Sequence, residues 1–565
     1  MPGGQVRWEQ GRYQPMPSLP RQQQWRPVPA RTPWWQREGV ISRVLAVAGV
    51  AVTLIGVVML LVLAAQAGFF GPVPRVVAGA VFSAALVGAG LRVHGKAGGQ
   101  VGAVALAATG IAGGYLDVVA VSGFYHWLPA VAGYVVALGI AAGGVWLAVR
   151  WGSQTLAVLV VAGAAVLAPA LSTDIALIGF LIVLQIAALP VHLVRDWPVL
   201  HVVRTLPAVL ATFAVAALTT VGRQFDSSGD GPWVRVLLAA IVIAAVGLVG
   251  ALLATRRRSG DVTASLTFAA ATLPLLVAPG MFDRRGAVVV AGSFAAVLLA
   301  VAAVALIPKL AERVRIPGHL TVVSAVAGAF ALLEACLGVT RVQTLPIALL
   351  LVALGFLAVG GQLRSRLAAV IGVAYGGLGM LVYLVRVHPT VLAEQSEAEA
   401  RLGISTALGA VAVLAAVAVG LWCARRLGMM AREHDATTLA VAGGIAALYA
   451  VTALSVSLGV ATGSKDGFLA GHGIATVVWM VAATAGMLYG LRNLARTPQR
   501  AKAALGVGLP LTAAALAKLF LFDLATLDGL VRAGAFLVVG VLLLLVGTRY
   551  ARAFAEAADR GAPTT

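Results

Sequence analysis

The sequence predicts an all-α, polytopic integral membrane protein with about eighteen transmembrane helices, in a range of about 16 to 20, and no sizeable soluble domain. Three observations lead to this prediction. Sixty per cent of the 565 residues are apolar and only 11% are charged, whereas soluble domains carry about 25% charged residues. Long uncharged runs recur along the chain, and basic residues alternate between the connections that join them. This composition excludes an ordinary soluble enzyme, a disordered chain and a DNA-binding module.

The two ends of the chain differ in composition from the rest. Residues 1–40 are rich in Pro, Gln and Arg, which is typical of a disordered, basic cytoplasmic tail. We interpret this tail chiefly as a flexible tether, and a protein partner that binds it is the alternative. Residues 41–548 form the predicted transmembrane domain, and residues 549–565 form a short cytoplasmic C-terminal tail.

Each predicted span is an apolar run long enough to cross a bilayer. A helix needs about 20 apolar residues to cross a hydrocarbon core of about 30 Å, and residues 44–65 contain no charge. Because backbone polar groups cannot stay unpaired in lipid, the runs must be helices. The predicted spans are 41–65, 73–91, 98–121, 127–149, 154–171, 175–193, 202–221, 234–254, 262–279, 287–306, 319–339, 343–360, 367–385, 402–423, 436–459, 471–491, 504–522 and 531–548.

Basic residues show which connections face the cytoplasm. Thirty Lys and Arg residues, Arg204 among them, fall in the two tails and the even-numbered connections, whereas ten fall in the odd-numbered ones. Lys518 lies within a span and completes the 41. Since Lys and Arg collect on cytoplasmic loops, we place both termini in the cytoplasm. The net charge of +20 then reflects topology and attraction to anionic lipid headgroups. No basic segment is long or aromatic enough to form a nucleic-acid groove.

The connections are too short to fold as separate domains. The longest outer ones cover about residues 222–233 and 386–401. The second is acidic, with Glu394, Glu397 and Glu399, and we favour a solvated helical loop over a metal site there. We therefore expect neither a bound metal nor a cofactor. The strings VLAPAL at 166–171 and LLVAP at 275–279 suggest an internal repeat, but the match is too short to establish one.

Ionisable residues inside predicted spans are the strongest candidates for a functional site. Such groups cost about 2.5–3.5 kcal/mol each at the centre of a helix in lipid. The candidates all lie near the outer end of their span or at its outer mouth. They could share a polar cavity open to the outer face, or each could extend separately to the lipid headgroups. The candidate residues are Asp117, Glu334, His472, Lys518, Asp523 and Arg532.

The C-terminal segment carries a family resemblance. The string LAKLFLFDLATLDGLVRAGAFLVVGVLLLLVG, which contains Lys518, Asp523 and Arg532, resembles the closing signature of a bacterial family of predicted membrane proteins, domain of unknown function 2339. GHGIATVVWMVAATAGMLYGLR, with His472 and Trp479, resembles another span of that family, and residues 39–92 resemble its first two spans. Members often have a lysine near the outer end of the first span, where this chain has alanines at 64 and 65. The resemblance implies a many-spanning inner-membrane protein without an assigned activity.

Three functions fit these observations. The first is a transport-like protein, or one that handles a lipid or an envelope precursor, with a polar site in the outer third of the bundle. The second is a membrane-embedded transferase with a lipid-linked donor, which is disfavoured because the first outer connection, residues 66–74, has no carboxylate. The third is a scaffold that recruits envelope machinery through its N-terminal tail. We favour a role other than catalysis, in the bacterial plasma membrane, on a small-molecule or lipid substrate whose identity the sequence leaves open.

Overall fold

A computed structural model describes most of the chain as helices. The described residues are 3–4, 52, 56, 59, 71–96, 99–225, 233–257, 260–307, 309–310, 317–493, 498–520 and 529–561. Every regular element in these ranges is helical, which confirms the all-helical prediction. The predicted N-terminal tail and the first predicted span lie almost wholly outside them. The chain divides into two compact units, Met1–Gly110 and Ile111–Thr565.

The first unit contains α2 (Pro72–His94) and the beginning of α3 (Gln100–Val119). Proline stands in the first turn of α2, where its missing N–H has no helical partner to lose. Small residues bring these two helices close together. A methyl group on Gly110 would lie 2.5 Å from the backbone oxygen of Ser83, so only glycine fits there. Small residues at helix contacts commonly permit such a close approach in membrane proteins.

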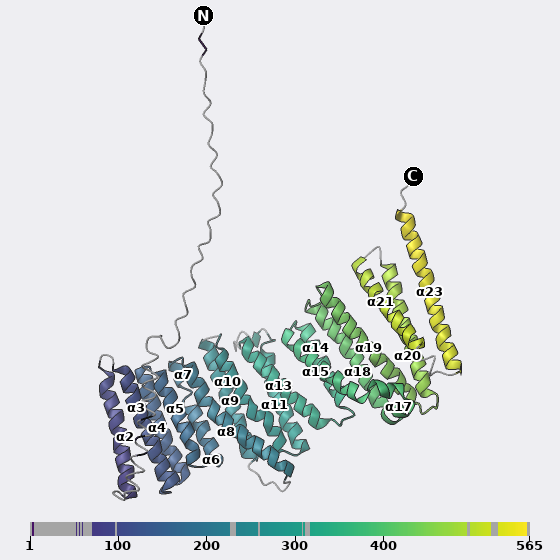
Figure 1. The fold of residues 1–565 in the computed structure, drawn as a ribbon. Coiled ribbons are helices and arrows are strands. Elements are labelled where there is room, and N and C mark those ends of the chain that lie inside the picture. Colours follow the sequence, from purple (N-terminus) through teal and green to yellow (C-terminus); the bar gives the residue numbers. More distant parts are fainter. Residues whose placement is uncertain are drawn as a thin grey trace. The chain divides into compact units, whose positions relative to one another are not determined.

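The second unit is a succession of helices joined by short connections (Figure 1). Its elements after α3 are η2 (Ala120–Phe124), α4 (Ala130–Trp151), α5 (Gln154–Leu167), η3 (Ala168–Ala170), α6 (Ile175–Ala187), α7 (Val191–Val194), α8 (Pro198–Phe225), α9 (Trp233–Arg257), α10 (Val262–Val277), η4 (Ala278–Met281), α11 (Arg284–Val304), α13 (Gly318–Val339), α14 (Leu345–Gln362), α15 (Arg366–Arg386), α16 (Pro389–Ala393), α17 (Gln395–Arg401), α18 (Ile404–Arg426), α19 (Glu433–Ala461), α20 (Gly467–Arg492), α21 (Pro498–Lys518) and α23 (Gly529–Gly561).

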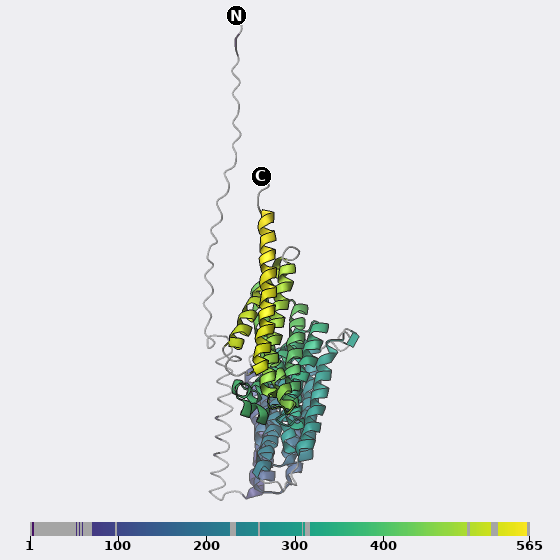
Figure 2. The ribbon, with the colours of Figure 1, turned by 90° about the vertical axis from the view of Figure 1, so that its right-hand side faces the viewer.

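Thirteen of the described helices are long and apolar enough to cross a membrane. Four further helices have shorter apolar stretches: Gln154–Ala170, Ile175–Ala187, Ala504–Lys518 and Ala533–Arg549. Every predicted span from 73–91 onward coincides with one of these helices. The total of about eighteen stays a prediction, because the first span is outside the described residues and four helices are short. Figure 2 shows α23 as one long helix, which continues through residues 549–561 of the predicted C-terminal tail.

Polar side chains fix where several helices begin. The side chains of Ser153, Asp261, Asp283 and Ser365 each accept a hydrogen bond from a backbone N–H in the first turn of the helix that follows. These four residues stand immediately before α5, α10, α11 and α15. Because the first N–H groups of a helix have no partner within it, such caps stabilise the helix start. The sequence therefore marks these boundaries with a single residue each.

The two strings that suggest a repeat have the same local structure. In each, an α-helix runs directly into a 3₁₀ turn that contains an Ala-Pro pair, η3 after α5 and η4 after α10. In each, an aspartate then stands at the start of the next long helix, Asp174 before α6 and Asp283 before α11. This shared helix, turn and aspartate arrangement supports the interpretation of these segments as equivalent parts of an internal repeat.

In the second unit, some of the glycines that recur four residues apart lie at close contacts between helices. A methyl group on Gly372 would lie 2.8 Å from Leu357, so α14 and α15 approach closely there. Gly139 and Gly143 have the same spacing, but a methyl group on either would have no atom within 4 Å. Those two glycines therefore face open space in the described structure, and a spacing of four residues does not by itself place a glycine in a helix contact.

Candidate functional site

Lys518 is bound to the neighbouring helix α20. It is the last residue of α21 and is followed by two residues in π-helical conformation, a conformation that is frequent at functional sites. Its Nζ donates to the hydroxyl oxygen of Thr476 at 2.6 Å and to the backbone oxygen of His472 at 3.1 Å. The Thr476 hydroxyl also donates to the His472 oxygen, at 3.2 Å. We call His472, Thr476 and Lys518 the Lys518 cluster.

His472 connects this cluster to the connection between α15 and α18. Its side chain is buried, and its Nε2–H donates to the backbone oxygen of Leu392 at 2.8 Å. Because a carbonyl oxygen can only accept, this bond places a proton on Nε2. The ring of Phe468 meets the imidazole edge to face, with ring centres 4.7 Å apart. The imidazole is thus held in one orientation between α20 and α16.

The connection that covers the cluster is more than the solvated loop that its composition predicts. It is helical, as predicted, but α16 and α17 have a buried side: Val391 and Ala398 are 0% exposed. These residues join the core formed with Tyr383 and Phe468. The hydroxyl of Tyr449 on α19 also donates to the backbone oxygen of Val387. The prediction missed this burial because the glutamates dominate the composition, while the apolar residues alternate with them.

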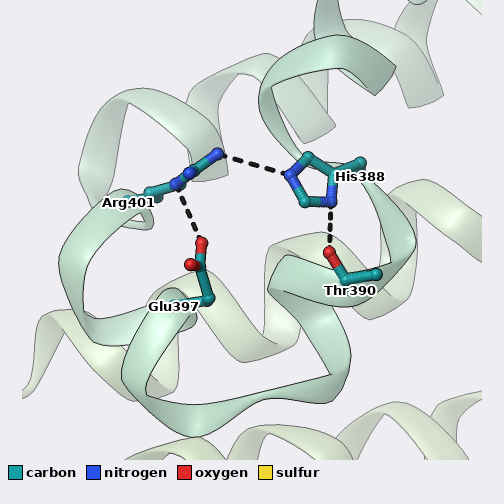
Figure 3. A network of polar contacts seen from close by, with 4 residues as sticks. All are labelled: His388, Thr390, Glu397 and Arg401. Atoms are coloured by element: carbon teal, nitrogen blue, oxygen red, sulfur yellow. Dashed lines mark hydrogen bonds and ion pairs between the residues drawn. The ribbon is translucent and has the colours of Figure 1, made fainter.

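The exposed side of this connection holds a polar network (Figure 3). Arg401 forms an ion pair with Glu397 at 3.0 Å and donates to Nε2 of His388 at 3.3 Å. The Nδ1–H of His388 then donates to the hydroxyl of Thr390 at 2.5 Å. These bonds join the beginning of α16 to α17 across the exposed side of the connection. Among the described residues, no group of three or more His, Cys, Asp or Glu is arranged to hold a metal ion.

Asp117 and Glu334 lie elsewhere in the second unit. Asp117 is in the last turn of α3, just before the π-helical turn η2, and has a buried Oδ2 without a hydrogen-bond partner among the described residues. Glu334 is in α13, and its buried Oε2 likewise has no partner in the described part of the chain. The helix α13 packs mainly against α11 and α10, whereas α21 packs against α20. Glu334 and Lys518 thus stand on helices that have different neighbours.

Two candidate residues cannot be placed. Asp523 lies outside the described residues, and Arg532 is within α23 but its side chain is outside them too. The structure therefore brings together two of the six candidates, His472 and Lys518. It adds Thr476, which the sequence did not single out. The sequence feature that could have identified Thr476 is its position one helical turn after His472, because residues four apart share a helix face.

Sequence reasoning also misplaced a buried cation. Arg204 was counted with a cytoplasmic connection, but it lies in the second turn of α8 and is only 1% exposed. Its Nη1 donates to the backbone oxygen of Gln185 at 3.3 Å, and its Nη2 donates to Nδ1 of His201 at 2.9 Å. We call these three residues the Arg204 cluster. A methyl group on Gly250 of α9 would lie 2.6 Å from Nη2, so α9 closes over the guanidinium.

The Arg204 cluster has no acidic member. Gln185 is fully buried, and its side-chain amide has no hydrogen-bond partner among the described residues. The signal that could have identified the cluster is the spacing of His201 and Arg204, because residues three apart lie on one face of a helix. Counting basic residues by connection does not use this spacing, because the count assigns every arginine near the end of a span to a loop.

Comparisons with known proteins give the chain a family but no characterised relative. No curated protein and no solved structure matches it. A family model described as Predicted membrane protein (DUF2339) matches residues 42–473 and, in a second overlapping match, residues 362–553. Together the two matches cover most of the chain and include His472, Thr476, Lys518 and Arg204. The chain therefore belongs to the DUF2339 family of predicted membrane proteins.

Proposed function

We propose that this protein handles a lipid or an envelope precursor in the bacterial plasma membrane, in a transport-like role, through the Lys518 cluster. The observation that carries the proposal is a lysine at the end of an apolar helix, bound to Thr476 and to the backbone of His472, beneath the cover formed by α16 and α17. Cations inside transmembrane segments commonly mark substrate or ion pathways. The ammonium would attract an anionic headgroup.

The side of the membrane follows from the charge distribution. If both termini are cytoplasmic, the α16–α17 connection and the Lys518 cluster lie at the outer face. Envelope precursors that reach the outer leaflet commonly carry phosphate groups on an apolar anchor. The nearby cover is held by hydrogen bonds that His472 and Tyr449 donate to its backbone oxygens. A partly buried cation beside lipid and next to such a cover suits the capture of such a headgroup.

The test is complementation of a strain that lacks the gene. We expect Lys518→Ala to abolish complementation while the protein inserts at normal abundance, and Lys518→Arg to retain part of it. The matched control is Lys465→Ala, because Lys465 is an exposed lysine just before α20, at the same end of the bundle. Lipid-linked precursors in the membrane would be measured by mass spectrometry in each strain.

Two outcomes would reject the proposal. Full complementation by Lys518→Ala would show that the lysine has no part in function. Loss of complementation together with loss of the protein from the membrane would assign Lys518 a structural role. Deleting residues 1–36 distinguishes the transport-like function from the scaffold alternative. A scaffold that acts through the tail would no longer complement the strain, whereas a transport-like protein would still do so.

A further inference from the structure

An apolar groove lies between the last three long helices, and none of its lining residues belongs to the Lys518 cluster. It has a volume of about 360 Å³, which falls within the range of about 300–1,000 Å³ found for small-molecule sites. Its walls come from α20, α21 and α23, which also pack together through Met480, Ala515 and Val539. The lining residues are Met480, Thr484, Met487, Leu509, Thr512, Leu543, Val546 and Gly547.

One polar group in the groove has no hydrogen-bond partner among the described residues. Thr484 is 5% exposed, and its hydroxyl makes no hydrogen bond with any described residue. The other hydroxyl, that of Thr512, already donates to the backbone oxygen of Gly508 at 2.8 Å. Leaving a buried hydroxyl unpaired in apolar surroundings costs free energy. The groove therefore offers a donor to a ligand that is otherwise apolar.

Positive charge lies at one end of the groove. Arg492 ends α20, five residues after the lining residue Met487. Arg549 follows the lining residue Val546 by three, so these two residues share a face of α23. Both arginines are exposed. At about 1.5 Å per residue, they stand within about 8 Å of the lining along their helices, within reach of a long side chain. A phosphate at this end would meet two guanidinium groups.

We propose that this groove binds an anionic phospholipid from the leaflet at the Arg492 and Arg549 end. An acyl chain would lie between α20, α21 and α23, an ester oxygen would accept from Thr484, and the phosphate would pair with the arginines. The surfaces beside the groove are apolar and exposed, with Leu509 at 62% and Leu544 at 71%, as expected where helices face lipid tails. The inference is independent of the proposed function, because it uses neither Lys518 nor its partners.

Native mass spectrometry of the full chain tests the proposal. The protein would be released from nanodiscs that contain equal amounts of phosphatidylglycerol and phosphatidylcholine. Gly547→Leu would fill the groove, and Gly534→Leu is the matched control on the same helix, because a methyl group at either position has no atom within 4 Å. We expect Gly547→Leu to lower bound phosphatidylglycerol about tenfold, which corresponds to about 1.4 kcal/mol, and Gly534→Leu to leave it unchanged.

The charged end is tested separately. Arg492→Gln with Arg549→Gln should remove the preference for phosphatidylglycerol over phosphatidylcholine, while Arg425→Gln, an exposed arginine at the end of α18, should preserve it. Unchanged lipid occupancy in Gly547→Leu would overturn the proposal. Loss of a dimer in that variant, with lipid occupancy unchanged, would instead identify the groove as a contact between two copies of the chain.

Discussion

The Arg204 cluster and the Lys518 cluster each hold a cation among apolar helices, but in different surroundings. Arg204 is enclosed by α6, α8 and α9, is only 1% exposed, and donates to groups that belong to the packing itself. Lys518 is partly exposed and lies at the end of its helix, close to a covering connection. Because the guanidinium is enclosed and donates to a backbone oxygen and an imidazole of the packed helices, we interpret Arg204 as structural. A lysine at the boundary is better placed to meet a ligand. The stability of variants in each region tests this contrast.

The largest effect is expected from Arg204→Ala. The change leaves a cavity between α6, α8 and α9 and removes the donors to Gln185 and His201. Truncating a large buried side chain to alanine commonly costs about 2–5 kcal/mol. We therefore expect a marked fall in the melting temperature of the detergent-purified protein. Arg425→Ala serves as the control, because that arginine is exposed at the end of α18. Equal melting temperatures for the two variants would show that Arg204 does not have a structural role.

The second largest loss of stability is expected from Gly471→Ala. This residue precedes His472 of the Lys518 cluster. The added methyl group would lie 2.7 Å from the Cα of Val456 and 2.8 Å from the backbone oxygen of Ser455. Backbone atoms cannot move aside as a flexible side chain can, so α19 and α20 must separate. Overpacking of this kind costs about 1–3 kcal/mol. Gly444→Ala, a change on α19 with no atom within 4 Å, should melt like the unmodified protein.

Lys518→Met should have a smaller effect on stability. The Thr476 hydroxyl still donates to the backbone oxygen of His472 after the lysine is replaced, so only the Thr476 hydroxyl oxygen loses its donor. The change removes two hydrogen bonds, but it also removes a charge from largely apolar surroundings. We therefore expect a net loss of about 1 kcal/mol. A drop in melting temperature as large as that of Arg204→Ala would show that the two clusters play the same role.

The smallest effect is expected from Glu397→Gln in the covering connection. This change removes the ion pair with Arg401, whose side chain is 50% exposed while that of Glu397 is 39% exposed. Exposed pairs four residues apart in a helix are worth about 0.3–0.5 kcal/mol. Melting temperatures measured at low and high salt should therefore differ little between the variant and the unmodified protein. A large, salt-sensitive loss would indicate that the network of Figure 3 holds the cover in place.

Local sequence was sufficient for most of the helices and for part of the site. An apolar run of span length has to form a helix in lipid because its backbone has no other partner, so the predicted spans from 73–91 onward coincide with helices. The cap residues Ser153 and Asp261 act within three residues of their own position. The candidates Lys518 and His472 stood out because charged or titratable groups near the ends of apolar runs are rare.

Other features depend on contacts between segments that are distant in the chain. The backbone oxygen of Leu392 lies 80 residues from the imidazole that donates to it. Thr476 and Lys518 meet across 42 residues. Whether Asp117, Glu334 and Lys518 share a cavity could not follow from their common depth, since depth says nothing about which helices are neighbours.

The all-helical, many-spanning architecture and the family could both be read from the order of residues, because both follow from local composition and motifs. Packing between distant helices was needed to show that Arg204 is interior rather than part of a loop, and that the acidic connection covers His472 with its apolar side. The difference arises because burial is a property of pairs of helices. The amino-acid sequence of a segment shows that it is apolar, but only the packing of the helices shows what each face of that segment contacts.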